Sequence, residues 1–223
     1  MMPPQRGKLI VFEGLDRSGK STQCARLVQH LRSSQPHPTA VEHLRFPNRS
    51  TPIGQMIDNY LSGQTQQEDH VIHLLFSANR WESAAGIEAA LAAGTTVVVD
   101  RYYYSGCVYS AAKGVPGMDL RWCRQADVGL PRPDVCLFLD LTAEETARRG
   151  GFGAERYEEK GMQKRVGELF AELQDGWDER QDMVVIDAGR RVEVVEREIR
   201  EVVEDVMRRV DQGGFAVRHV RGR

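Results

Sequence analysis

The feature that most constrains this chain is a glycine-rich loop near its N-terminus. Residues 14–21 read GLDRSGKS and fit the pattern G-x-x-x-x-G-K-[ST]. An apolar stretch that predicts a buried strand precedes the loop and a predicted helix follows it, the setting in which this pattern indicates a phosphate site. Backbone N–H groups can surround the phosphates, Lys20 can reach the β and γ oxygens, and Ser21 can bind Mg²⁺. The loop predicts a nucleoside triphosphate site formed by Gly14, Leu15, Asp16, Arg17, Ser18, Gly19, Lys20, Ser21 and Thr22.

The rest of the chain alternates between predicted strands and predicted helices. Short apolar runs predict strands at 8–12, 40–44, 95–99, 134–139 and 183–186. Helices are expected at 20–33, 52–61, 69–93, 119–128, 143–149, 156–179 and 192–210. This alternation predicts an α/β fold with a five-stranded parallel sheet flanked by helices, as in P-loop NTPases. We expect one domain over residues 1–223 with a core of about 8–210, and a polar, basic tail at 211–223 that frays.

Missing motifs narrow the class of nucleotide-binding protein. The chain lacks the Asn-Lys-x-Asp motif of a GTPase, and it lacks an Asp-x-x-Gly switch directly after the third predicted strand. Residues 61–64, LSGQ, fall one glycine short of a transporter signature, and we interpret them as a helix C-terminus with its glycine cap. The small size of the chain and the lack of appended domains favour a small-molecule kinase.

Charge and cysteine usage exclude other functions. The chain has 30 Lys plus Arg against 32 Asp plus Glu and a net charge of −2, so it lacks the basic field that a nucleic acid or an anionic membrane would require. Four well-separated cysteines without a metal-binding pattern indicate reduced thiols. No apolar run approaches the ~20 residues that span a bilayer, and residues 1–6 lack the apolar region of a signal peptide. We therefore expect a cytoplasmic protein with neither a nucleic-acid nor a membrane partner.

Two predicted strands end in residues suited to phosphate chemistry. The third strand is followed by Asp100 and Arg101, and the second by Arg45. Ligands of open α/β sheets bind at the carboxyl ends of the strands, so Asp100 can hold Mg²⁺ while the arginines grip phosphate. A simple strand-terminating turn is the alternative interpretation of Asp100 and Arg101. The chain has 25 Arg and only 5 Lys, an excess that composition alone also explains.

The order of motifs along the chain resembles the thymidylate kinase family, of the eukaryotic type. The matching stretches are FEGLDRSGKSTQ at 12–23, RFP at 45–47, LLFSANRWE at 74–82, DRY at 100–102, SG at 105–106, PRPD at 131–134, RGGFG at 149–153 and ERYE at 155–158. The resemblance extends from about residue 8 to residue 210. It implies a nucleoside monophosphate kinase that uses Mg²⁺-bound ATP to convert dTMP to dTDP, and a homodimer.

The resemblance also implies roles for individual residues on the acceptor side. The residues expected to contact dTMP are Asp16, Arg45, Phe46, Phe76, Arg80, Arg101, Ser105, Gly106, Tyr109, Tyr157 and Gln163. Phe76 would stack on thymine and Arg80, one helical turn later, would donate to O4, although a core position is also natural for Phe76. Tyr109 would exclude a ribose 2'-hydroxyl. Tyr157 and Gln163 would close from a lid at about 148–164, although exposed helix positions are equally compatible with their sequence.

On the donor side the resemblance implies three catalytic residues, Arg17, Lys20 and Arg101, with Ser21 and Asp100 as the metal site. Arg17 occupies the position at which the eukaryotic type carries an arginine within the phosphate loop. Arg149 would stack on adenine, and the turn at Asp187 would border it. Two alternatives remain open: another nucleoside monophosphate kinase, or a nucleotide-binding regulatory protein that has lost turnover.

Overall fold

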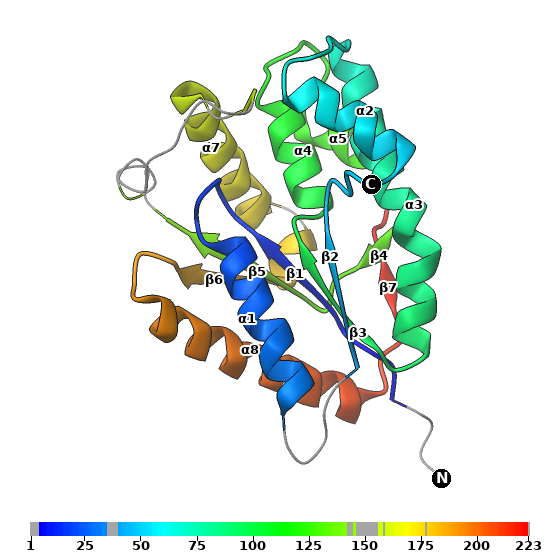
Figure 1. Cartoon of the computed structure of the whole chain (residues 1–223), viewed down its shortest axis with the longest axis vertical. Coiled ribbons are helices and arrows are strands. Elements are labelled where there is room, and N and C mark those ends of the chain that lie inside the picture. Colours follow the sequence, from blue (N-terminus) through cyan, green and yellow to red (C-terminus); the bar gives the residue numbers. More distant parts are fainter. Residues whose placement is uncertain are drawn as a thin grey trace.

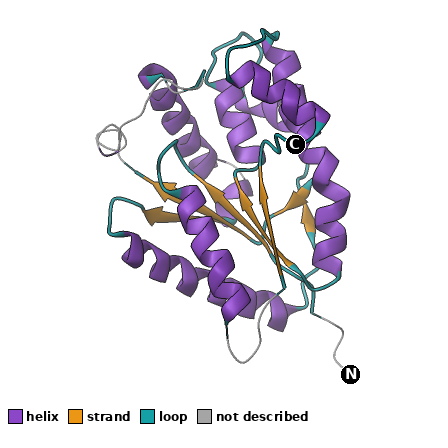
Figure 2. Cartoon of the chain, in the orientation of Figure 1, coloured by secondary structure: helices purple, strands orange, loops and turns teal. Residues whose placement is uncertain are grey.

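The computed structural model describes residues 5–34, 40–141, 145, 156–157, 159–176 and 178–222. Its centre is a five-stranded, entirely parallel sheet in the order β2-β3-β1-β5-β6. The strands are β1 (Leu9–Glu13), β2 (Val41–Arg45), β3 (Thr96–Asp100), β5 (Val135–Asp140) and β6 (Met183–Asp187). Figure 2 shows the strands lying between helices. The predicted fold class is confirmed.

Each of the five strands ends one residue later than the apolar pattern predicts, on a charged residue. These end residues are Glu13, Arg45, Asp100, Asp140 and Asp187. The ladder continues onto them, since Phe12 pairs with Asp100 and Arg45 pairs with Asp100 in the neighbouring strands. Sheet hydrogen bonds therefore hold the backbone of these charged residues at the carboxyl edge, so their side chains start from fixed positions rather than from a free loop.

Helices cover both faces of the sheet (Figure 1). The helices are α1 (Lys20–Ser33), α2 (Pro52–Leu61), α3 (Asp69–Ala92), α4 (Tyr103–Ala111), α5 (Leu120–Gln125), α7 (Lys160–Gly176) and α8 (Val192–Gly213), with a 3-10 turn η1 at Asp178–Gln181. Alternate residues of the buried strands face opposite sides: Ile10 and Phe12 pack with α1 and α8, whereas Leu9 and Val11 pack with α3, α4 and α7.

The helix following β1 and the helix following β3 therefore cover opposite faces, although β1 and β3 are neighbours in the sheet. Adjacent strands whose connections diverge in this way leave a crevice beyond their carboxyl ends, where ligands bind in open α/β sheets. The phosphate loop after β1 meets Asp100, the last residue of β3, and Arg101, which follows it, at this crevice.

Helix prediction fails at α4, which the sequence pattern does not indicate. Eight of its nine residues are buried, so it lacks the polar face on which amphipathic periodicity depends. Two other helices are shorter than predicted: α5 ends at Gln125 rather than 128, and α7 begins at Lys160 rather than 156. Most of the helix predicted at 143–149 and most of the predicted lid lie outside the described residues.

The prediction that the C-terminal tail frays is wrong. Helix α8 continues to Gly213, and β7 (Arg218–His219) then pairs antiparallel with β4 (Pro131–Arg132). Val220 is 2% exposed and joins the core beneath α5. Val217 also packs against this core, and Arg218 pairs with Asp182 at 2.8 Å. Two valines and one ion pair thus anchor a tail whose average composition is polar. Within the part of the chain that the structure describes, no helix has the length and apolar character needed to span a bilayer.

Candidate active site

The phosphate loop between β1 and α1 depends on two glycines with positive φ. Gly14 has φ of 138° and Gly19 has φ of 94°, conformations that are accessible at little cost to glycine alone. A Cβ on Gly14 would lie 2.5 Å from the carbonyl oxygen of Leu139 in β5. Gly19 is the N-cap of α1, so the loop delivers a helix N-terminus, with its unpaired N–H groups, to the carboxyl edge of the sheet.

Two arginines in the site also have strained backbones. Arg17 (φ 66°) and Arg101 (φ 68°) are the non-glycine residues with positive φ in the described part of the chain. This conformation costs about 1–2 kcal/mol for a residue with a Cβ. Both residues line one cavity. Strain of this kind clusters at functional sites, where it helps to aim a side chain.

Ser21 and Asp100 bring two oxygen ligands together across the crevice. The Ser21 hydroxyl donates to Asp100 Oδ2 at 2.5 Å, and Arg45 Nε lies 3.8 Å from the same oxygen. Hydroxyl and carboxylate oxygens are the ligands that Mg²⁺ prefers. The donor set present here fits that ion.

Arg101 and Asp16 form an ion pair between the end of β3 and the phosphate loop. Arg101 Nη1 also donates to Ser105 Oγ at 3.1 Å. Burial raises the pKa of the Asp16 carboxyl, but the charges of Arg101 and Lys20 and the hydrogen bonds from Tyr109 and Gln163 outweigh burial and lower that pKa overall. Asp16 is therefore held as a carboxylate at the centre of the site.

A buried carboxylate that sequence reasoning missed supports this arrangement. Glu13, at the end of β1, is fully buried. It accepts hydrogen bonds from the backbone N–H groups of Tyr102 (2.8 Å) and Ser105 (3.0 Å) and from Ser105 Oγ (2.5 Å). The N-cap residue of α4 supplies no side-chain cap, so Glu13 provides the acceptor for the backbone donors at the start of this helix. Burial raises the pKa of Glu13, and Arg101 only partly offsets that rise. Glu13 thus fixes the turn that carries Arg101.

Lys20 lies within the phosphate loop and is 5% exposed. Its ammonium donates to the carbonyl oxygen of Leu15 and, at 3.4 Å, to Ser18 Oγ. Burial lowers the pKa of Lys20 to about 7, and the charge of Arg101 acts in the same direction, while Asp16, Asp100 and Glu13 raise it. A bound phosphate would supply the negative charge that favours the protonated form.

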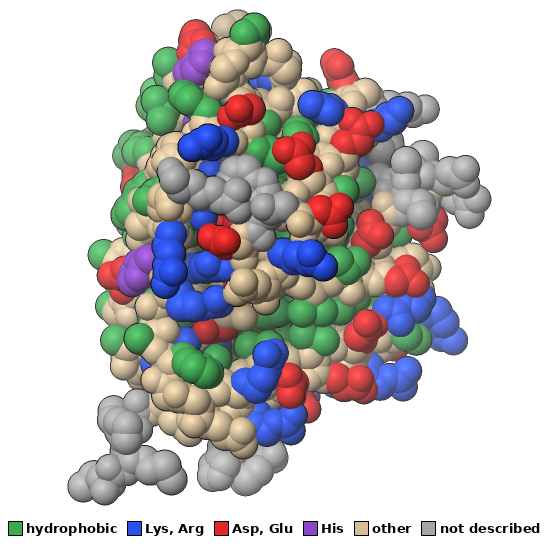
Figure 3. All heavy atoms as spheres, turned by 180° about the vertical axis from the view of Figure 1, so that it is seen from behind, with side chains coloured by type: hydrophobic (Ala, Val, Ile, Leu, Met, Phe, Trp, Pro, Cys, Tyr) green, Lys and Arg blue, Asp and Glu red, His purple; other side chains and the backbone are tan. Residues whose placement is uncertain are grey.

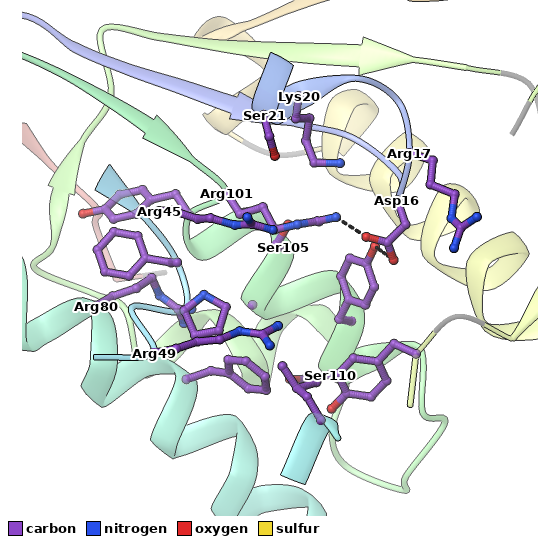
Figure 4. A pocket seen from close by; sticks show the side chains of 18 of the residues that line it. Asp16, Arg17, Lys20, Ser21, Arg45, Arg49, Arg80, Arg101, Ser105 and Ser110 are labelled. Carbon is purple, nitrogen blue, oxygen red and sulfur yellow. Dashed lines mark hydrogen bonds and ion pairs between the residues drawn. The ribbon is translucent and has the colours of Figure 1, made fainter. Parts of the chain in front are cut away.

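One cavity of about 580 Å³ joins the phosphate loop to helices α3 and α4, within the usual range for small-molecule sites. Figure 4 shows Arg45, Arg101 and Asp16 across its middle, with Lys20 and Ser21 on one side and Arg80 and Arg49 on the other. The predicted site residues that line it are Asp16, Arg17, Gly19, Lys20, Ser21, Thr22, Arg45, Phe46, Phe76, Arg80, Arg101, Ser105, Gly106, Tyr109 and Tyr157.

Two residues from different elements donate to the Asp16 carboxylate besides Arg101. Tyr109 OH and Gln163 Nε2 donate to Oδ2 at 3.0 and 2.7 Å, and the Tyr157 ring packs on Tyr109 with centroids 5.7 Å apart. Gln163 is buried rather than an exposed helix residue. Because a carboxylate offers about four lone-pair positions, Asp16 retains room for one further donor.

Residues 156–157 lie against α2 and the turn that follows it. Arg156 stacks over the Tyr60 ring at 4.2 Å and donates to the Tyr60 carbonyl (3.2 Å) and to Gln66 Oε1 (2.9 Å). Its backbone N–H donates to the Leu61 carbonyl at 3.2 Å. These contacts hold Tyr157 at the cavity wall.

Some predicted residues lie elsewhere, and some cavity residues were not predicted. Asp187 lies at the same sheet edge, outside the cavity lining, and its side chain is 66% exposed beside Arg190. Arg149 lies outside the described residues. The cavity also contains Arg49 and Ser110. Arg49 lies in the loop after β2, four residues beyond Arg45, and its closeness in sequence to a predicted phosphate-binding arginine could have indicated its place in the cavity. Ser110 belongs to helix α4, which was not predicted.

A phosphate loop at the crevice of a parallel sheet, opening into a cavity with a second group of arginines and an aromatic ring, defines a P-loop nucleotide kinase. The thymidylate kinase family model matches residues 12–199, and the chain belongs to the thymidylate kinase family.

Relatives from distant organisms show the same similarity. The thymidylate kinase of Arabidopsis thaliana is 49% identical over 93% of this chain and 75% of its own length. That of Homo sapiens is 45% identical over 93% of this chain and 94% of its own length. The solved thymidylate kinase structure from Candida albicans superposes with a TM-score of 0.84 at 35% identity, covering 98% of this chain and 100% of that one.

Proposed function

We propose that this protein phosphorylates dTMP to dTDP with ATP, a step in the supply of dTTP for DNA synthesis. One observation carries this function: the family match covers residues 12–199, and within that span a single cavity joins Lys20 of the phosphate loop to Phe76 and Arg80 on α3. A different nucleoside monophosphate kinase is not favoured, because the named relatives are thymidylate kinases.

The acceptor would lie along the cavity with its base toward α3. Phe76 would stack on thymine, and Arg80 would donate to O4. Arg45, Arg101, Phe46, Ser105 and Gly106 would surround the monophosphate end, and Asp16 would accept the 3'-hydroxyl. Tyr157 and Gln163 would close over the sugar. The Tyr109 ring, tilted against the Tyr157 ring and near Arg101, would leave no room for a 2'-hydroxyl.

The γ-phosphoryl group would pass directly from ATP to dTMP by in-line transfer. A phosphate oxygen of dTMP attacks the γ-phosphorus of ATP, and the bond from that phosphorus to the bridging oxygen breaks to release ADP. The acceptor phosphate is already ionised near pH 7, so the reaction needs no general base. Arg17, Lys20 and Arg101 would orient the two phosphates and offset their charge. The loop residues 14–22 would hold the triphosphate, and Arg149 and Asp187 would border adenine.

Magnesium fits the oxygen ligands of Ser21 and Asp100, which hydrogen-bond one another in the crevice. Bound there with ATP, it would neutralise charge on the β and γ phosphates. We expect turnover to require the ion and chelation to abolish turnover.

We further propose that the chain forms one domain and pairs as a homodimer through α3. Val71, Leu74 and Trp81 recur at helical spacing and are 45%, 50% and 42% exposed. Figure 3 shows hydrophobic side chains gathered along the left edge, where α3 lies. Sedimentation analysis of Leu74→Glu tests this assembly, since a retained dimer would exclude this face.

The buried, unpaired cysteines favour a reducing, cytoplasmic location, and the balanced charge argues against a nucleic-acid partner.

The decisive experiment is an ADP-release assay with dTMP, dUMP, UMP, CMP, AMP and GMP as acceptors. The proposed function predicts the highest kcat/KM with dTMP. A preference for UMP or AMP would overturn it, and ATP binding without phosphate transfer to any acceptor would indicate a regulatory protein instead.

A further inference from the structure

The guanidinium of Arg80 is held from one edge by a residue outside the cavity. Arg80 Nε donates to Asp127 Oδ1 at 2.9 Å, and Nη2 donates to Oδ2 at 2.8 Å. The two side chains are 3% and 0% exposed. This bidentate pairing fixes both the position and the plane of the guanidinium. Nη1 has no hydrogen-bond partner among the described residues, although Arg80 lines the cavity.

The surroundings leave Arg80 little alternative to this orientation. A Cβ on Gly106 of α4 would lie only 2.6–2.9 Å from the guanidinium atoms, so α4 packs closely against it. Ser77, one turn earlier on α3, donates to Asp127 Oδ1 at 2.9 Å. Burial lowers the pKa of Arg80, but the charge of Asp127 outweighs burial and raises it. Asp127 therefore both compensates the buried cation and determines its direction.

The turn that carries Asp127 is itself fastened on two sides. On the α3 side, Trp81 Nε1 donates to the Ala126 carbonyl at 2.9 Å. On the other side, the N–H of Gly129 donates to the Val220 carbonyl at 2.8 Å, and the N–H of Val220 donates to the Leu130 carbonyl at 2.9 Å. The C-terminal strand thus helps to hold the residue that orients Arg80.

We propose that Asp127 is the positioning residue that makes Arg80 discriminate between acceptor bases. By engaging Nε and Nη2, it leaves Nη1 as a fixed donor toward the cavity. A guanidinium can only donate, so this donor matches a base with a carbonyl at C4 and opposes a base with an amino group there. A fixed polar group rejects the mismatched ligand because one of the two partners remains unpaired. The inference rests on the proposed function.

The test compares Asp127→Asn with Asp134→Asn, measuring kcat and KM for dTMP and dCMP. Asp134 is a matched control, because it forms the same kind of bidentate pair, with Arg6 at 2.6 and 2.9 Å, before the start of β5 and away from the cavity. In Asp127→Asn one carboxylate oxygen is replaced by an NH2 group, which cannot accept the hydrogen bond from Arg80 Nη2. The guanidinium would therefore lose its bidentate pairing and its fixed orientation. We expect KM for dTMP to rise about 10- to 100-fold with a smaller change in kcat, and the preference for dTMP over dCMP to fall. Asp134→Asn should leave that preference unchanged.

Two further experiments test whether Asp127 acts through Arg80 and whether the result depends on one variant. In an Arg80→Ala background, Asp127→Asn should have no additional effect on the dTMP to dCMP preference, because it acts through Arg80. If Asp127→Asn does not fold, Ser77→Ala replaces it, with a smaller fall in preference expected. An unchanged preference in a folded Asp127→Asn or, failing that, Ser77→Ala protein would overturn the inference. A wild-type protein that does not phosphorylate dTMP would instead overturn the proposed function.

Discussion

The two ends of the cavity are built in different ways. At the phosphate end, the key groups follow strand ends directly, and two glycines and two strained arginines set their geometry. At the base end, Phe76 and Arg80 project from the middle of α3, and their positions depend on α4, on Asp127 and on the C-terminal strand. Backbone conformation positions the first set, whereas side-chain packing positions the second.

This difference has a functional reason. Phosphate is bound by backbone N–H groups and fixed charges, which a short loop can supply by itself. A base is recognised by one stacking ring and a few directed hydrogen bonds, which require rigid elements supported from behind. Substitutions at the phosphate end should therefore lower kcat, and substitutions at the base end should change KM and selectivity.

The largest expected effect is at Arg17, whose replacement by glycine should lower kcat about 10²- to 10⁴-fold if its charge stabilises the transferred phosphoryl group. The same change should not lower the melting temperature, because glycine relieves the φ of 66° at this position. Steady-state kinetics and a thermal melt measure the two effects. An unchanged kcat would remove Arg17 from the catalytic residues, and a lower melting temperature would show that its packing outweighs its strain.

The phosphate end is also the part that the sequence predicts well. The loop, the strands beside it and the charged residues at their ends are consecutive in the chain, so a local pattern contains them. Prediction fails where support comes from elsewhere: Glu13 and Asp127 give no local signal, because their partners Ser105 and Arg80 are 92 and 47 residues away. Helix α4 escapes detection because it is buried on nearly all sides. The C-terminal strand escapes detection because the contacts that anchor it, through Val217, Arg218 and Val220, join it to distant parts of the chain.

At the base end, Phe76→Ala should raise KM for dTMP about 10- to 100-fold, since stacking of a base on an aromatic side chain contributes about 1–3 kcal/mol. The change in kcat should be much smaller, because Phe76 lies away from the phosphates. Phe76→Tyr, which keeps the ring, is the matched control. A fall in kcat without a change in KM would contradict the inference that the base end governs KM and the phosphate end governs kcat.

Tyr109 lies between the two ends and should affect sugar selectivity. Tyr109→Ala should reduce the preference for dTMP over its ribonucleotide about tenfold, because removal of the ring opens space beside the sugar. Tyr109→Phe keeps that ring but loses the 3.0 Å hydrogen bond to Asp16. It should therefore retain the preference. Equal selectivity in the wild type and the alanine variant would exclude the ring as a steric gate.

The smallest expected effect is the uptake of a proton by Lys20 when ATP binds at the phosphate end. Burial lowers the pKa of Lys20 to about 7, and the phosphates of bound ATP should raise it. Below pH 7 the ammonium is already protonated, so binding takes up few protons; above pH 7 uptake should approach one proton, and ATP affinity should fall as pH rises. Calorimetry at pH 8 in buffers of different ionisation enthalpy measures this uptake. Thymidine, which carries no phosphate, should bind without uptake, because Asp127 keeps the pKa of Arg80 raised and the lowered pKa of Asp16 keeps that carboxylate ionised. Equal uptake for both ligands would place the titrating group outside the phosphate loop.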